Sequence, residues 1–134
     1  PNRLNRAYLS TIKSFNASLW DATAIMCRRT LEGILKDVLD KDATGKLYDQ
    51  IKTLIKRKEI VKPLETLAHA LREGGNLGAH FNSEYDTNYE IAKLMIDFIE
   101  YLLQYIYELP KSIEKLEEQI KALAVSNENE LNKN

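Results

Sequence analysis

Four residues that can take part in acid–base or phosphate chemistry recur at helical spacing in one short segment: His69, Arg72, Asn76 and His80. Their separations of three, four and four residues would place them on one face of an unbroken helix. A guanidinium binds phosphate through a fork of donors, and an imidazole exchanges protons near neutral pH. An asparagine amide can orient either group. This set suits metal-free cleavage of RNA, in which the 2′-hydroxyl supplies the nucleophile.

Glycines in the same segment leave a second interpretation open. Three of them fall within five residues: Gly74, Gly75 and Gly78. Such a run is a poor helix former, so we expect at least one of them to have a positive φ or a close backbone neighbour. In this interpretation His80 caps the segment, Asn76 takes the left-handed conformation and Arg72 pairs with Glu32.

Two further groups of residues are candidates for binding nucleic acid. One is a run of basic residues at the end of a helical pattern: Lys56, Arg57 and Lys58. These side chains either contact phosphates or form a solvated helix end. The other group, Arg28 and Glu32, stands four residues apart on an earlier helical pattern and either lines a groove or forms a helix ion pair. With His69, they complete the candidate nucleic-acid-binding residues.

The composition limits the partners and the compartment. A net charge of -1 provides no field that would draw the whole molecule to nucleic acid or a membrane, so phosphate binding must be local. No apolar run approaches the roughly 20 residues that cross a bilayer, and no signal-peptide pattern opens the chain. The single Cys27 excludes an internal disulfide framework and a multi-cysteine zinc site. We therefore expect a cytoplasmic protein with no metal or other cofactor.

Apolar residues recur at helical spacing in six segments: about residues 4–15, 19–39, 46–58, 63–71, 87–109 and 113–123. Capping-box patterns precede two of them, with Ser18 and Thr87 as the expected caps. Gly33 interrupts the second segment, and a close helix crossing would explain it. Pro110 is expected to end or kink the fifth segment. Cys27 lies on the apolar stripe and is expected in the core.

These patterns predict an all-α protein: a bundle of four or five core helices with a C-terminal helix at its edge. We expect the bundle to span residues 1–112, the C-terminal helix 113–125 and a polar tail 126–134. The C-terminal helix has apolar residues at spacings of three, four and three: Ile113, Leu116, Ile120 and Leu123. This row fits two heptads of a coiled coil. Three roles for the helix stay open: it docks on the bundle, pairs with another chain or leads into a further domain. The initial Pro1 suggests a domain taken from a longer protein.

Three sequence features resemble a known family. They are Trp20-Asp21-Ala22 followed by Cys27–Glu32, the glycine-containing segment Leu71–His80, and a tyrosine-rich helix that ends in Leu109-Pro110. Together they resemble the bacterial domain of unknown function 4145 family, which is often appended to restriction endonucleases and other defence proteins. That family is similar to the HEPN superfamily of helical domains.

The resemblance implies a HEPN-like helical bundle that is usually dimeric. In active HEPN members, arginine and histidine from two protomers share a groove and cleave RNA without a metal. His80 matches the family histidine, and Asn76 resembles a polar residue inside the motif. Arg72 departs from the pattern, because its separation from His80 by seven residues exceeds that of active members. Arg28 or Glu32 would supply the polar group on the second helix.

Two hypotheses about function follow. In the first, the chain is an RNA-binding or RNA-cleaving effector domain, with His80 as acid or base and Arg72 on the phosphate. In the second, it is a non-catalytic module that dimerises or senses for an enzyme elsewhere in the parent chain.

Overall fold

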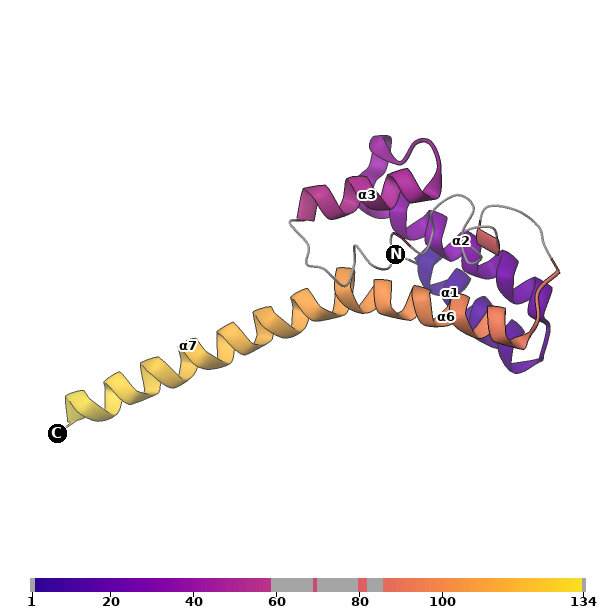
Figure 1. Cartoon of the computed structure of the whole chain (residues 1–134). Coiled ribbons are helices and arrows are strands. Elements are labelled where there is room, and N and C mark those ends of the chain that lie inside the picture. The colour runs from indigo at the N-terminus through magenta and orange to yellow at the C-terminus, as the bar shows by residue number, and fades with distance from the viewer. Residues whose placement is uncertain (1, 59–68, 70–79, 82–85, 134) are drawn as a thin grey trace. The chain divides into compact units, whose positions relative to one another are not determined.

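The structure, a computed structural model, describes residues 2–58, 69, 80–81 and 86–133, and most of these residues are helical (Figure 1). Its elements are α1 (Asn2–Asn16), α2 (Trp20–Leu39), a short 3-10 helix (Asp40–Asp42), α3 (Leu47–Lys58), α6 (Tyr89–Leu103), a π-helical turn (Gln104–Glu108) and α7 (Leu109–Lys133). Those residues contain no β-strand. The predicted all-α class is confirmed, whereas the helix expected from Pro63 into the glycines lies outside the described residues.

The chain divides into two compact units, residues 1–100 and residues 101–134. The first holds α1, α2, α3 and most of α6, and the second is helical from its start through Lys133. The domain boundaries expected after residues 112 and 125 stay predictions. None of the helices in the described part of the chain combines the length and apolar character that crossing a bilayer requires.

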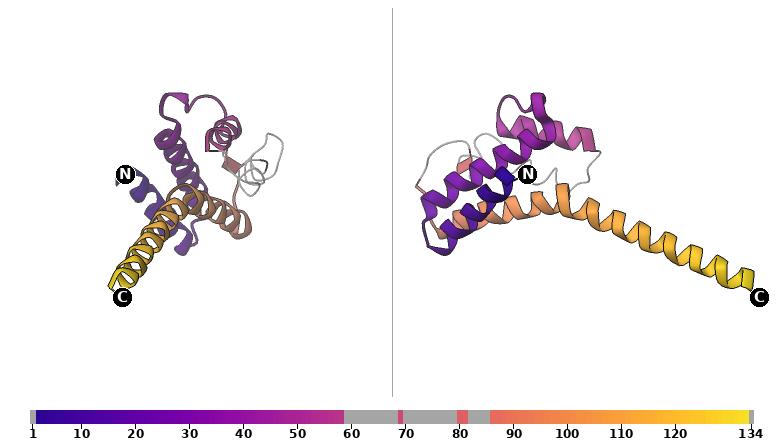
Figure 2. Two further views of the ribbon diagram at one scale, coloured as in Figure 1. Left: turned by 90° about the vertical axis from the view of Figure 1, so that its left-hand side faces the viewer. Right: turned by 180° about the vertical axis from the view of Figure 1, so that it is seen from behind.

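The core of the first unit lies along α2. The apolar α2 side chains with no or almost no exposed surface are Ala24, Cys27, Leu31, Ile34, Leu35 and Leu39. Helix α1 packs along α2, and both views of Figure 2 show the two helices side by side. Where they meet, the buried hydroxyls of Thr11 and Thr30 lie 3.3 Å apart. Each also donates to a carbonyl four residues earlier, so burial leaves neither hydroxyl without a hydrogen bond.

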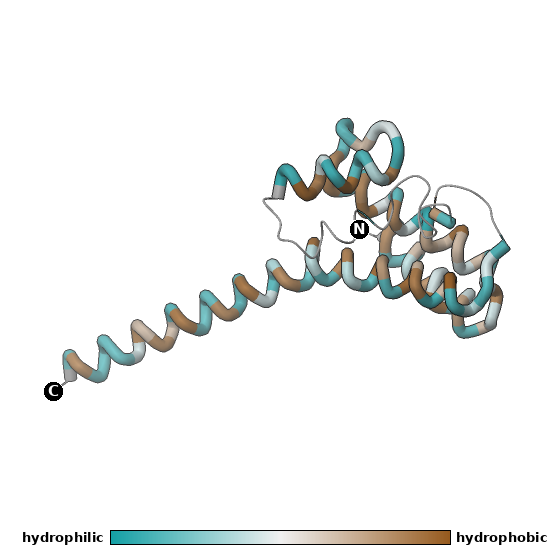
Figure 3. The backbone as a smooth tube through the Cα atoms, viewed as in Figure 1, coloured by the Kyte–Doolittle hydropathy of each residue, from teal (hydrophilic) through white to brown (hydrophobic). Residues whose placement is uncertain are grey.

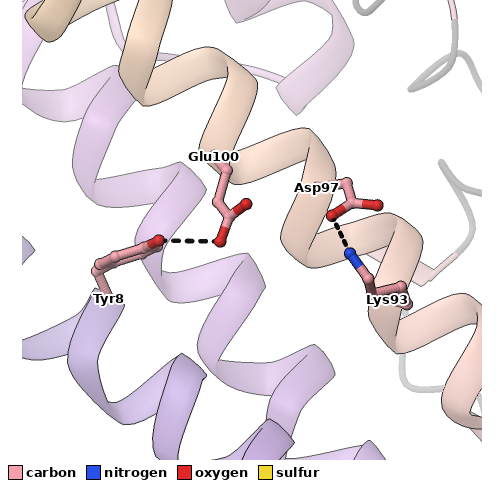
Figure 4. A network of polar contacts seen from close by, with 4 residues as sticks. All are labelled: Tyr8, Lys93, Asp97 and Glu100. Atoms are coloured by element: carbon pink, nitrogen blue, oxygen red, sulfur yellow. Dashed lines mark hydrogen bonds and ion pairs between the residues drawn. The ribbon is translucent and has the colours of Figure 1, made fainter.

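Helix α6 contributes Met95, Phe98 and Ile99 to the same core. Leu94 of the same helix is 53% exposed and does not belong to this core. On the α1 side, the Tyr8 hydroxyl donates to Glu100 at 3.1 Å, while Lys93 pairs with Asp97 along α6 (Figure 4). Burial raises the pKa of the Tyr8 phenol, and the neighbouring Glu100 carboxylate raises it further.

Three aromatic rings from different helices meet at the end of this core. Phe15 of α1, Trp20 of α2 and Tyr89 of α6 have ring centroids 5.4 to 5.7 Å apart. Tilted and edge-on arrangements at this separation are favourable. The trio joins the end of α1 to the starts of α2 and α6.

Both expected helix caps are wrong in detail. Ser18 has a φ of 59°, and α2 begins only at Trp20, after Leu19. At α6, the cap is Asn88 rather than Thr87: its side-chain oxygen accepts from the Ile91 N–H at 2.9 Å. The Thr87 N–H instead donates to the carboxylate of Asp21 at 2.8 Å. That long-range bond joins the first turn of α2 to the segment entering α6.

The two glycines of the first unit that the structure describes have different roles. Gly45 has a φ of +84°, which an L-residue rarely adopts, and it forms the turn before α3. Gly33 lies in mid-α2, where an added Cβ would stand 3.5 Å from the Leu4 side chain of α1. That is ordinary van der Waals contact, so the helix crossing at Gly33 does not require glycine.

Pro110 does not end the helix, contrary to one of the expected outcomes. The π-helical turn of Gln104–Glu108 precedes it, and the Leu109 N–H bonds to the Gln104 carbonyl five residues back. A wider turn of this kind accommodates the hydrogen bond that proline cannot donate. The helix then continues as α7 through the polar residues 126–133 (Figure 3).

Candidate functional site

His80 and Phe81, here called the His80–Phe81 segment, are both helical, and Arg28 of α2 bonds to their backbone. The Arg28 guanidinium donates from Nε to the Phe81 carbonyl at 2.8 Å and from Nη2 to the His80 carbonyl at 3.4 Å. Hydrogen bonds from a charged donor are among the stronger ones in proteins. Arg28 thus fixes two consecutive peptide groups that lie more than fifty residues away in sequence.

A second contact fixes the same segment from α6. The Phe81 ring is fully buried, and its centroid lies 5.3 Å from that of Phe98. His80 itself is half-buried, with its Nδ1 atom enclosed. The backbone that carries His80 is thus contacted from both α2 and α6. Of the three predicted catalytic residues, His80 alone lies within the described part of the chain.

Cys27, which precedes Arg28 on α2, is not a reactive group. Its side chain is completely buried in the α2 stripe, and this burial raises the pKa of the thiol to about 12. The thiolate is the nucleophilic form, so the thiol is inert near neutral pH. The prediction that Cys27 belongs to the core is confirmed.

Glu32 lies in a different environment from Arg28, although both are on α2. It lines an open hollow of about 410 Å³ together with Arg29, Gly33, Lys36, Ala43 and Gln50. Gln50 is buried, and its side-chain amide donates to the Gly45 carbonyl at 3.0 Å. This hydrogen bond stabilises the turn before α3. Two basic side chains and one acidic side chain border this hollow, so its charge favours neither anions nor cations strongly.

The basic end of α3 is partly neutralised. Arg57 forms an ion pair with Asp42 of the 3-10 helix, whereas Lys56 is exposed. Lys58 is the last residue of α3. The pair lies at the surface, where ion pairs add little stability. Arg57 therefore has less charge available for phosphate than the sequence suggests.

Several predicted site residues lie outside the described residues: Arg72, Asn76 and the glycines Gly74, Gly75 and Gly78. Their predicted roles stay predictions. His69 is helical and exposed. The structure brings Arg28 and His80 together, while the hollow around Glu32 includes neither.

Sequence reasoning missed the role of Arg28 as an anchor for the histidine backbone. The signal was indirect: an arginine next to a core cysteine must lie at the border of the buried stripe, where its guanidinium can reach buried carbonyls. No spacing rule could name its acceptors, since they come from a distant segment. Among the described residues, His, Cys, Asp and Glu side chains form no group of three or more that could hold a metal ion.

Comparisons with known proteins agree with the family resemblance. The chain matches the family described as Domain of unknown function (DUF4145) over residues 10–120, which include α2, α3, α6 and the His80–Phe81 segment. The comparison with curated proteins and the comparison with solved structures each gave no match. Because the family match covers most of the sequence, the chain belongs to the DUF4145 family.

Proposed function

We propose that this chain is a HEPN-like accessory or effector domain of a bacterial defence or restriction protein, and that it cleaves RNA without a metal. One observation carries the proposal: the Arg28 guanidinium anchors the carbonyls of His80 and Phe81. A surface histidine needs no such anchor, whereas an acid–base catalyst benefits from a fixed position. The proposed domain works in the cytoplasm as part of a longer protein.

In the proposed reaction, the 2′-oxygen of a ribose attacks the adjacent phosphorus, and the bond from phosphorus to the 5′-oxygen breaks. His80 takes the 2′-hydroxyl proton or gives a proton to the departing 5′-oxygen, and water carries the other proton. The products are a 2′,3′-cyclic phosphate and a 5′-hydroxyl. Arg72 would bind the phosphate and Asn76 would orient it. Arg28 would act as a positioning residue, since its Nε and Nη2 atoms donate to the backbone carbonyls of the His80–Phe81 segment.

The test is cleavage of single-stranded RNA in EDTA by the parent protein and by two His80 variants. We expect cyclic-phosphate products from the parent and a rate about 10²–10⁴-fold lower for His80→Ala. His80→Asn keeps a polar side chain but cannot exchange protons near neutral pH. Its cleavage rate should therefore fall as far as that of His80→Ala. Circular dichroism checks that both variants keep the parent's helical signal.

If the domain without substitutions cleaves no RNA, the same test should be made on the full-length protein that contains it. Equal RNA cleavage by the full-length protein with and without His80→Ala would end the catalytic proposal. Loss of cleavage only in the variant would support it, and would show that the attached domain is needed.

A second candidate function is a non-catalytic module that dimerises or senses for an enzyme domain of the same chain. The exposed apolar residues along α7 favour it, because they form a surface for association. This candidate predicts no RNA cleavage by the parent, and a loss of stability rather than chemistry when His80 or Arg72 is replaced.

A further inference from the structure

Helix α7 has an apolar row that its own unit does not cover. The row, here called the α7 seam, consists of Leu109, Ile113, Leu116, Ile120 and Leu123, with exposed fractions of 46%, 50%, 54%, 58% and 63%. Figure 3 shows hydrophobic bands recurring along this helix. Most helices in proteins gain their stability by packing an apolar face against another element. Residues 101–133 form one helical run, which cannot cover its own stripe.

The seam has the geometry of a coiled coil. Its residues are spaced four, three, four and three apart, which repeats every seven residues. Isoleucine occupies the a positions at Ile113 and Ile120, and leucine occupies the d positions at Leu109, Leu116 and Leu123. β-Branched residues at a with leucine at d favour two parallel strands over larger assemblies. We infer that the α7 seam pairs with the seam of a second copy of this chain, as a parallel two-stranded coiled coil.

Asn127 supports the parallel arrangement. It occupies the next a position after Ile120, where an asparagine is known to set register and the number of strands. In a parallel, in-register pair, Asn127 faces the same amide of the second copy and the two can hydrogen-bond. In an antiparallel pair, the amide would face a residue near the opposite end of the helix, where the seam is apolar. An unpaired amide at such a position would be costly.

The charges of α7 argue against an anionic membrane surface or RNA as the occupant. Between Leu109 and Lys133 the helix has four lysines and five glutamates, so its polar face has no excess of positive charge. Helices that bind anionic surfaces have a wide apolar face bordered by many basic residues. The flanks of the seam are mostly uncharged, with Ser112, Gln119 and Ser126 at g positions. A second copy therefore meets no like-charge repulsion at these g positions. The seam ends at Asn127, before the next d position, Glu130, where two carboxylates would face each other.

The length of the seam sets the expected affinity. Five apolar residues and one asparagine span fewer than three heptads, and stable coiled coils are usually longer. The dimer should therefore dissociate at concentrations on the order of micromolar and be complete well above them. The inference is independent of the proposed RNA cleavage, since it rests on α7 alone.

A matched pair of lysine substitutions tests the surface. Leu116→Lys places a charge in the seam, whereas Val125→Lys places the same charge at an f position on the outer face. Leu116 and Val125 are exposed to nearly the same extent, 54% and 55%. Light scattering and sedimentation across a concentration series should show a parent dimer, at least about a tenfold weaker dimer for Leu116→Lys and no change beyond twofold for Val125→Lys.

Cysteine cross-linking tests the orientation. Glu130→Cys places a thiol at a d position, and Glu128→Cys places one on the outer face at a b position. Cys27 is completely buried, so the new thiol is the reactive one. Mild oxidation should give a disulfide-linked dimer from Glu130→Cys and far less from Glu128→Cys, as in a parallel, in-register pair. A parent that stays monomeric at all concentrations, a dimer equally weakened by both lysines, or equal cross-linking by both cysteines would overturn the inference.

Discussion

Identical residue types have opposite surroundings in α2 and α7. Leu31 and Ile34 of α2 have no exposed surface, whereas Leu116 and Ile120 of α7 are more than half exposed. Both helices are amphipathic with a helical period. In residues 1–100, α1 and α3 pack against α2, while α7 belongs to a unit that is one helical run. The pattern identifies a face that is suited to burial, and the surrounding chain decides whether it is buried.

The largest expected difference comes from truncating one leucine in each helix. Leu31→Ala should lower the free energy of unfolding by about 2–5 kcal/mol, because it removes contacts and leaves a cavity in a closed core. Leu116→Ala should change it by less than about 0.5 kcal/mol at submicromolar concentration, where α7 is unpaired. Urea denaturation of both variants measures the two effects. A similar cost at both positions would show that α7 packs as tightly as α2.

Arg28 and Arg29 allow a comparison between adjacent residues of α2. Arg28→Ala should destabilise the protein by about 1.5–3 kcal/mol, since it removes a charged donor from two backbone carbonyls. Arg29→Ala changes an exposed side chain beside the open hollow and should cost less than about 0.5 kcal/mol. Hydrogen exchange should also speed up around His80 in the first variant only. Equal effects of the two substitutions would remove the basis for treating Arg28 as an anchor of His80.

Two glycine substitutions separate backbone strain from packing. Gly45→Ala should destabilise by about 1–2 kcal/mol, because alanine is strained at a φ of +84° although no atom lies within 4 Å. Gly33→Ala should instead stabilise by up to about 1 kcal/mol, since alanine is the better helix former and the Leu4 side chain leaves room. Thermal unfolding of both variants measures the sign. Destabilisation by Gly33→Ala would mean that α1 and α2 cross more closely than described.

The smallest expected effect is alkaline destabilisation through Cys27. Its thiol has a pKa near 9.0 when exposed and about 12 in the folded chain. Folding therefore favours the protonated form, and this contribution is fully present below pH 9 and lost as pH rises toward 12. The loss should reach roughly 1 kcal/mol by pH 10. Denaturation of the parent and of Cys27→Ala at pH 8, 9 and 10 tests it: the variant should lose less stability over this range, and parallel losses would contradict the assignment.

Features with a local physical cause could be predicted from the sequence. The stripes of α2 and α3 are such features, because helical periodicity alone determines which residues share a face. The predicted core position of Cys27 followed directly and is confirmed. The α7 row was also recognisable as a coiled-coil pattern, although its exposure was not.

Features that depend on distant residues could not be predicted. Thr87 looked like a helix cap, but its N–H bonds to Asp21, and the cap moves to Asn88. Arg28 looked like a partner for Glu32 or a groove residue, but its guanidinium reaches the His80–Phe81 segment. Both cases involve polar groups whose partners are fixed by tertiary packing. The predicted pairing of Arg72 with His80 has the same dependence and stays a prediction.

Hydrogen exchange at two protein concentrations tests the central contrast most directly. Amides of α2 should be protected equally at submicromolar and at high micromolar concentration, because residues 1–100 cover that helix themselves. Amides between Leu109 and Asn127 should exchange rapidly when dilute and become protected as the α7 seam pairs. Protection of α7 that is the same at both concentrations, whether high or low, would contradict the account that a second copy covers the α7 seam.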